Sequence, residues 1–141
     1  MRTIFIIAIA TFAIGCAGSK GAQPDGIRTW IAQRSQALAS LEPTRIADTI
    51  SGSYLQDCET RAQATERWTR AIDGATAVRV VNVSVTERIY APHTDLAYFR
   101  ASWRIEIDRG NETEVLFTQG EFWLWRRDTG VWREWGNQAC Q

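Results

Sequence analysis

Hydrophobic residues in the first third of the chain recur at helical intervals. Between Asp25 and Leu41 they lie three, four and seven positions apart, as on one face of an amphipathic helix. These residues are Ile27, Trp30, Ile31, Leu38 and Leu41. Asp25 is placed to cap the helix. Pro43 then interrupts the pattern, so a second, short helix is predicted over Thr44–Ile50 and ends before Gly52.

A short strand and a third helix are predicted next. The strand is Ser53–Leu55, with Tyr54 at its centre, and the helix is Asp57–Ile72. The apolar side of this helix carries Ala62, Trp68, Ala71 and Ile72. Asp57 fits the start of the helix as its N-cap, and Asp73-Gly74 fits its end.

The hydrophobic period changes after Ala75 from that of a helix to that of strands. Val78–Tyr90 alternates, and Leu96–Ile107 alternates more cleanly. One face of the first strand carries Val81, Val83, Val85 and Ile89. One face of the second carries Ala97, Phe99, Ala101, Trp103, Ile105 and Ile107, and the other carries Tyr98, Arg100, Ser102, Arg104 and Glu106. The second strand is therefore predicted to have one buried face and one face that is wet or paired.

Turns divide the rest of the chain into antiparallel strands. Pro92–Asp95 is the first turn, and Arg109–Asn111 leads into a strand over Glu114–Trp125. Arg127–Gly130 then leads into Val131–Trp135. The sequence does not decide which face of the 114–125 strand is buried, because both faces carry apolar residues. Helices followed by an antiparallel meander predict an α+β domain.

The start of the chain has the pattern of an export signal. Arg2 precedes an apolar run over Ile4–Ile14, which is too short to span a bilayer and is typical of a signal peptide. The run closes with Ala-Ile-Gly-Cys, which resembles the bacterial lipobox. The resemblance implies that residues 1–15 are removed and that acyl chains such as palmitate attach to Cys16. A plain secretory signal, cleaved near Ala17-Gly18, is the alternative.

The residues after Cys16 bear on localisation and domain organisation. Ala17 stands where an Asp would mark retention in the inner membrane. For a Gram-negative source, the resemblance therefore implies an outer-membrane anchor that faces the periplasm. Residues 16–24 contain Gly, Ser and Pro without an apolar period and are predicted to be a flexible tether. This leaves 25–141 as a single domain.

The cysteines that remain outside the lipidation site form an even pair. If Cys16 is lipidated, Cys58 and Cys140 are left, and in an oxidising compartment they are expected to form one disulfide. Two buried free thiols are the alternative. His93 is the only histidine and the chain has no Cys-x-x-Cys pair, so no metal site and no cofactor are predicted.

Charge and composition narrow the class of protein. The 141 residues include 16 Lys and Arg against 16 Asp and Glu, so the chain lacks the basic excess typical of nucleic-acid binding. Seven residues are Trp, and four of these lie near the end of the chain. The four are Trp123, Trp125, Trp132 and Trp135. Because they differ in parity, some of them are predicted to form an exposed partner surface for another protein, a glycan or a second copy of the chain.

The last predicted hairpin, Phe122–Arg133, consists of an aromatic strand, a charged turn with Asp-x-Gly and a strand with Trp. Together with the preceding order of helix, short helix, Tyr54 strand, helix and long strands, it resembles the NTF2-like superfamily over about residues 25–138. The resemblance implies a strongly bent antiparallel sheet around a long helix, which forms a cone with one open mouth. The residues expected in its pocket or core are Tyr54, Trp68, Phe99, Trp103 and Phe122. Relatives commonly dimerise through the outer face of the sheet, so the resemblance favours homodimerisation there over binding of another protein or a glycan. The fold serves enzymes, transport factors and secretion-machine parts alike, so it assigns no reaction.

Candidate catalytic residues are few. Enzymes of the resembled superfamily, such as ketosteroid isomerase, place ionisable groups on an apolar wall, where the pKa of a carboxyl group is raised. The resemblance carries over one such position, Asp57, whose alternative role is the helix cap. Glu121 with Arg100 is either part of a site or a cross-strand ion pair on the outer face of the sheet.

The sequence therefore favours a non-catalytic envelope lipoprotein whose domain binds a small apolar ligand or a protein partner. One alternative is a small-molecule isomerase or hydrolase with Asp57 as general base. A further alternative is a structural subunit of an envelope or secretion complex.

Overall fold

The computed structural model describes residues 26–90, 95–126 and 130–140. The predicted signal peptide and tether, the lipidation site Cys16, the cap Asp25 and the lone His93 lie outside these residues. Among the helices that the structure describes, none is long and apolar enough to cross a bilayer.

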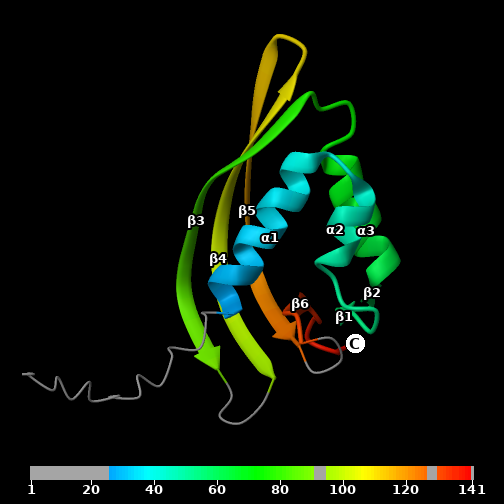
Figure 1. Ribbon diagram of the computed structural model, residues 1–141, viewed down its shortest axis with the longest axis vertical. Helices are drawn as coiled ribbons and strands as arrows, with labels where there is room; N and C mark the ends of the chain where they lie inside the picture. Colours follow the sequence, from blue (N-terminus) through cyan, green and yellow to red (C-terminus); the bar gives the residue numbers. More distant parts are fainter. Residues whose placement is uncertain (1–25, 91–94, 127–129, 141) are drawn as a thin grey trace, which may run out of the picture.

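Within the described residues, three helices cover one face of a curved antiparallel sheet (Figure 1). The helices are α1 (Gly26–Ser40), α2 (Pro43–Asp48) and α3 (Arg61–Ala71). The strands are β1 (Leu55–Gln56), β2 (Glu59–Thr60), β3 (Ala77–Tyr90), β4 (Leu96–Arg109), β5 (Glu112–Trp125) and β6 (Arg133–Glu134). The main sheet has the order β3-β4-β5-β6, and β1 pairs with β2 in a separate hairpin. The predicted order of helices followed by long strands is confirmed.

The core lies between α1 and the inner face of β4. The alternation predicted for β4 is observed on the inner face, where Ala97, Phe99, Ala101, Trp103, Ile105 and Ile107 are buried. Tyr98 is also buried, on the outer face, where Trp123 packs against it. The fully buried Trp30 of α1 packs edge-on against Phe99 and Trp103, with ring centroids 5.7 and 6.1 Å away. Phe122 of β5 completes the cluster, 5.5 Å from Trp30. Aromatic rings therefore fill the centre of the cone.

The pairing of β5 with β4 settles which face of β5 is buried. Phe122 lies opposite Phe99, and Leu124 lies opposite the buried Ala97. Because side chains alternate along a strand, residues in phase with Phe122 share the inner face. The outer face carries Val115, Phe117, Gln119, Glu121, Trp123 and Trp125.

The predicted inner face of β3 is partly wrong, because the strand contains two bulges. Register shifts at Val81 and Thr86 each insert one unpaired residue, which reverses the phase of the side chains that follow. Val81 and Ile89 are consequently 50% and 51% exposed. Val83 and Val85 pack against the core as predicted.

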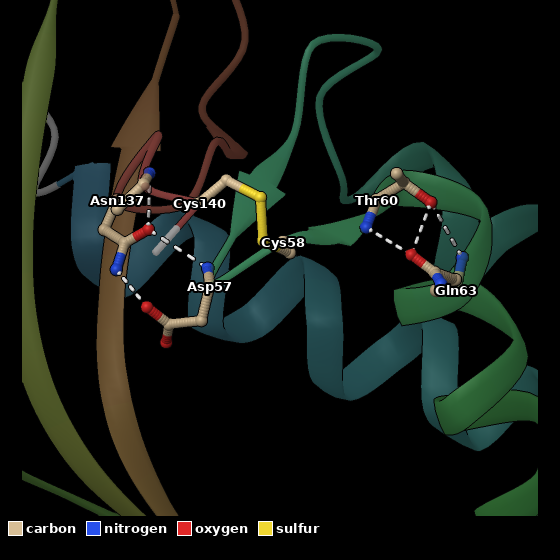
Figure 2. The surroundings of a disulfide bond; sticks show 7 residues. Asp57, Cys58, Thr60, Gln63, Asn137 and Cys140 are labelled. Carbon is tan, nitrogen blue, oxygen red and sulfur yellow. Dashed lines mark hydrogen bonds between the residues drawn. A yellow bond between two sulfur atoms is a disulfide. The ribbon is translucent and has the colours of Figure 1, made fainter.

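The third helix begins at Arg61 and not, as predicted, at Asp57. Thr60 is its N-cap and forms a reciprocal capping box with Gln63 (Figure 2). Asp57 and Cys58 have φ angles of 47° and 70°, a left-handed conformation that an α-helix does not contain. They form the turn between β1 and β2, so the interpretation of Asp57 as a helix cap is wrong.

A disulfide joins Cys58 to Cys140, as predicted, across a sequence separation of 82 (Figure 2). Backbone hydrogen bonds accompany it: the Cys58 N–H donates to the carbonyl of Ala139 at 3.0 Å, and the Gln138 N–H donates to that of Leu55 at 2.9 Å. Closing a loop of this length stabilises the fold by on the order of 4 kcal/mol in the chain-entropy model. The end of the chain is thereby fixed against the β1–β2 hairpin.

Candidate functional site

A cleft of about 370 Å³ lies between the edge of β5, helix α3 and the β1–β2 hairpin. Residues 118–122 of β5 form one wall. The side chains across from them are those of Tyr54, Gln56, Asp57, Glu59, Arg67, Trp68 and Glu134. We call this hollow the β5 cleft. It lies at the edge of the sheet, because aromatic rings occupy the centre of the cone.

A buried ion pair supports the cleft from the interior. Nη2 of Arg34 on α1 lies 2.6 Å from Oε2 of Glu134 on β6, and the two side chains are 1% and 8% exposed. Nε of Arg34 donates to Oγ1 of Thr49 at 2.6 Å. The guanidinium lies 4.7 and 5.5 Å from the ring centroids of Trp30 and Trp68. Burial lowers the pKa of Arg34, although the neighbouring Glu134 opposes that change.

A second network lies at the mouth of the cleft. Nε and Nη2 of Arg67 donate to the two carboxylate oxygens of Glu59 at 2.8 and 3.2 Å, and the Tyr54 hydroxyl donates to the same carboxylate at 3.1 Å. Burial alone raises the pKa of Glu59, but the bonds from Arg67 and Tyr54 outweigh it and leave the pKa below its ordinary value. Burial and the charges of Glu134 and Glu59 raise the pKa of Tyr54. Tyr54 is therefore a proton donor in a hydrogen bond and not an acid that ionises near neutral pH.

Asp57 lines the cleft from the exposed turn between β1 and β2. Its carboxylate accepts hydrogen bonds from Nδ2 of Asn137 at 2.8 Å, drawn in Figure 2, and from Nε2 of Gln56 at 3.0 Å. These bonds lower the pKa of Asp57. A carboxylate in this setting is ionised at neutral pH and has less affinity for a proton than an ordinary Asp.

Glu121 and Arg100 meet on the outer face of the sheet. The two residues are direct cross-strand partners, and Nη2 of Arg100 lies 2.6 Å from Oε1 of Glu121. Nε of Arg100 also donates to the hydroxyl of Tyr98 at 2.8 Å. The structure therefore places Glu121 at the rim of the cleft and joins it to Arg100 as a cross-strand ion pair, while Asp57 belongs to a different cluster.

The other predicted site residues fall into three places. Tyr54, Trp68 and Phe122 line the β5 cleft, whereas Phe99 and Trp103 belong to the filled core. On the outer face, Trp123 packs against Tyr98 and Trp125 stacks on Trp135, with centroid distances of 4.7 and 4.8 Å. Trp132 instead packs against the core and against Tyr90, 6.4 Å away.

Sequence reasoning missed the charged residues that organise the cleft. Arg34 lies four residues after Trp30 and four before Leu38, so it stands within the apolar stripe of α1. A charge at such a position indicates a buried partner, and this was the available signal. Glu134, its partner 100 positions away, carries no comparable signal. In the part of the chain that the structure describes, no three His, Cys, Asp or Glu side chains are grouped to hold a metal ion.

Solved structures share this fold. A putative scytalone dehydratase from Novosphingobium aromaticivorans has a TM-score of 0.64 at 13% identity, over 79% of this chain and 78% of its own. A conserved protein from Planctomyces limnophilus has a TM-score of 0.61 at 14% identity, over 79% and 89%. A putative dehydratase from the NTF2-like family of Streptomyces avermitilis has a TM-score of 0.57 at 8% identity, over 79% and 90%.

The chain therefore has the NTF2-like fold that its sequence resembles. At such low identities the likeness establishes the fold and no reaction. No protein-family model and no curated protein matches the sequence.

The buried ion pair generates a stability prediction. Arg34→Met leaves the Glu134 carboxylate buried without its partner, so the free energy of unfolding should fall by about 3 to 5 kcal/mol. The matched control is Arg70→Met, because Arg70 and Glu66 form an exposed pair, and it should change stability by less than about 1 kcal/mol. Urea unfolding followed by tryptophan fluorescence measures both.

A double variant separates the charge effect from lost packing. Arg34→Met combined with Glu134→Leu removes both charges, and it should be more stable than Arg34→Met alone. Equal losses for Arg34→Met and Arg70→Met, or fully additive losses in the double variant, would contradict the role given to this pair.

Proposed function

We propose that this protein is a lipid-anchored envelope protein whose NTF2-like domain binds a ligand or protein partner at the β5 cleft and catalyses no reaction. One observation carries the proposal: each carboxylate that lines the cleft already has a charged or hydrogen-bonding partner. The pairs are Glu134 with Arg34, Glu59 with Arg67, Glu121 with Arg100, and Asp57 with Asn137 and Gln56.

These partners work against acid–base catalysis. A general acid or base functions best when its pKa lies near the working pH, which for a carboxyl group requires apolar surroundings or a second negative charge. Asp57 and Glu59 instead have pKa values below the ordinary ones. Neither residue is suited to take a proton from a substrate at neutral pH, which favours binding over turnover.

The filled interior supports the same conclusion. Trp30, Phe99 and Trp103 are buried at the centre of the cone, and the Trp30 ring contacts both of the other rings. A small apolar molecule in that position would have to displace these rings from their packing. The β5 cleft, with Trp68 and Phe122 beside charged side chains, is the better candidate for a binding surface.

A small-molecule isomerase or hydrolase is the second candidate function. Two observations favour it: Asp57 lines the cleft, and solved structures described as putative dehydratases share the fold. We rank it second because Asp57 lies in an exposed turn, where its hydrogen bonds lower its pKa.

The proposed anchor predicts the mass of the mature chain. The chain extracted from membranes in mild detergent should begin at Cys16 and carry added acyl chains. It should also be two protons lighter than its reduced form, because Cys58 and Cys140 are joined. Intact mass spectrometry with and without reductant measures both. A soluble chain that begins near Gly18 without added mass would contradict lipidation.

Binding without turnover predicts a stoichiometric limit. Incubated with a small-molecule extract of the cells that export it, the mature chain should consume no compound beyond one molecule per chain, as followed by mass spectrometry. Asp57→Asn should behave in the same way, because Asn tolerates the left-handed turn and keeps an acceptor for Asn137. Product that exceeds the amount of protein and disappears in Asp57→Asn would instead establish the enzyme.

A further inference from the structure

Within the part of the chain that the structure describes, the edge of β5 that faces the cleft lacks a partner strand over most of its length. β6 pairs with β5 only at Leu124 and Trp125, and the carbonyl of Trp123 accepts one more backbone hydrogen bond, from Trp135. From Glu112 to Phe122, no backbone hydrogen bond reaches this edge from the described part of the chain.

The free backbone groups on this edge can be assigned by their phase. Ladder hydrogen bonds alternate along an antiparallel strand, so every second residue directs its N–H and C=O to the same side. The carbonyl of Trp123 faces β6, and Gln119 and Glu121 are in phase with it. Their N–H and C=O groups therefore point outward from the sheet at the cleft, where both residues are exposed.

The segment Thr118–Gly120 has none of the features that usually protect a sheet edge. Charges, prolines and bulges are the common devices against pairing with another chain. Glu112 and Glu114 place negative charges at the start of β5, in the β4–β5 hairpin, which extends beyond the helices (Figure 1). Thr118, Gln119 and Gly120 carry no charge and pair regularly with β4.

Two hollows flank this segment, one on each face of the sheet. The β5 cleft lies on the inner side, and a second hollow of about 390 Å³ lies on the outer side, where Arg100 and Ser102 line it together with Gln119 and Glu121. Alternate side chains of a strand point to opposite faces. A strand added beside β5 would therefore direct every second side chain into the β5 cleft and the others to the outer face, beside Gln119 and Glu121 at the near side of the second hollow.

We propose that β5 binds an extended segment of another protein by strand addition along Thr118–Phe122. The proposal rests on the binding function proposed above and specifies the partner. Backbone hydrogen bonds to Gln119 and Glu121 supply affinity, and the two hollows select side chains.

Charge and aromatic rings define the side chain that the cleft selects. Of the four carboxylates that line the cleft, Glu59, Glu121 and Glu134 are paired with arginines. The charge of Asp57 is matched only by amides, so Asp57 is the carboxylate that a cation would meet. Trp68 and Phe122 provide aromatic surface beside these charges. A Lys or Arg side chain fits this combination, because its stem packs on the rings while its cation faces carboxylates. The outer hollow, with Arg100 paired to Glu121, suits a small polar side chain.

A second copy of the chain fits this edge less well. β5 contains Glu112, Glu114 and Glu121 and no Lys or Arg. A second β5 strand would add three further carboxylates and no cation of its own, whereas a basic segment supplies cations.

The test uses the mature chain in detergent solution and a synthetic peptide of nine alternating Thr and Lys residues. This peptide should bind in calorimetry, and a peptide of alternating Thr and Glu should bind at least about tenfold more weakly. Bound peptide should slow hydrogen exchange in the fragment that spans Thr118–Trp123, because the outward amides of Gln119 and Glu121 become bonded.

Backbone methylation of the peptide tests strand addition independently of any change in the protein. N-methyl groups on the odd residues block one edge of the peptide, and those on the even residues block the other. One of the two peptides should lose at least about tenfold in affinity and the other should bind as the parent does.

A pair of protein variants gives the matching control. Gln119→Pro removes the outward N–H at a position where an edge strand tolerates proline, and it should weaken binding. Gln119→Ala removes the same side chain from the lining of the hollows but keeps the N–H, so it should weaken binding less than Gln119→Pro does.

Strand addition would be overturned if the Thr-Lys peptide did not bind, or if both methylated peptides lost affinity equally. It would also be overturned if bound peptide left hydrogen exchange in Thr118–Trp123 unchanged, or if dimerisation without peptide protected that fragment. These results do not bear on the absence of turnover, which the stoichiometric assay decides separately.

Discussion

The contact between Arg34 and Glu134 is the constraint on which the rest of this site depends. It joins the long helix α1 to the last strand of the sheet across 100 positions, with both side chains almost fully buried. A buried charge pair of this kind is costly to break, because either partner alone is left without its counter-charge. Glu134 also exchanges backbone hydrogen bonds with Thr49 and Ser51, at 2.9 and 2.7 Å. One residue thus fixes α1, the segment after α2 and the end of β5 relative to one another.

The shortness of β6 follows from where the chain goes next. Trp135 still donates its N–H to β5, but its carbonyl and the backbone of Gln138 and Ala139 bond to the β1–β2 segment, which the disulfide ties to the end of the chain. The chain thus turns from β5 to the hairpin, and within the described residues most of the β5 edge stays unpaired. The cleft and the free edge are two consequences of the same path.

Much of the fold was predictable, because β4 and α1 each bury one continuous face. The alternation from Ala97 to Ile107 predicts the buried face correctly as long as the strand is regular, and β4 pairs with β5 without a register shift. The bulges of β3 were not predictable, since an inserted residue at Val81 leaves no trace in a run of valines and depends on pairing with β4. The sequence did not decide which face of β5 is buried for a related reason. Only the register of β5 with β4 shows that Phe122 faces inward and Trp123 outward.

The site was less predictable than the fold, because its residues meet through long-range contacts. Asp57 looked like the start of a helix by its neighbours, but the disulfide and Asn137 hold it in a left-handed turn, and Thr60 caps the helix instead. Arg34 could have been singled out as a charge within an apolar stripe. Its partner could not, since nothing near Glu134 in the sequence indicates burial.

We propose that the cleft binds without acid–base chemistry, because hydrogen bonds lower the pKa of Asp57 and those from Arg67 and Tyr54 lower that of Glu59. Titration of the side-chain carboxyl carbons by nuclear magnetic resonance tests it most directly. We predict that the pKa values of Asp57 and Glu59 both lie below those of the same groups in unstructured peptides. A pKa raised toward neutrality for either carboxyl group would contradict this account and identify that residue as a candidate general base.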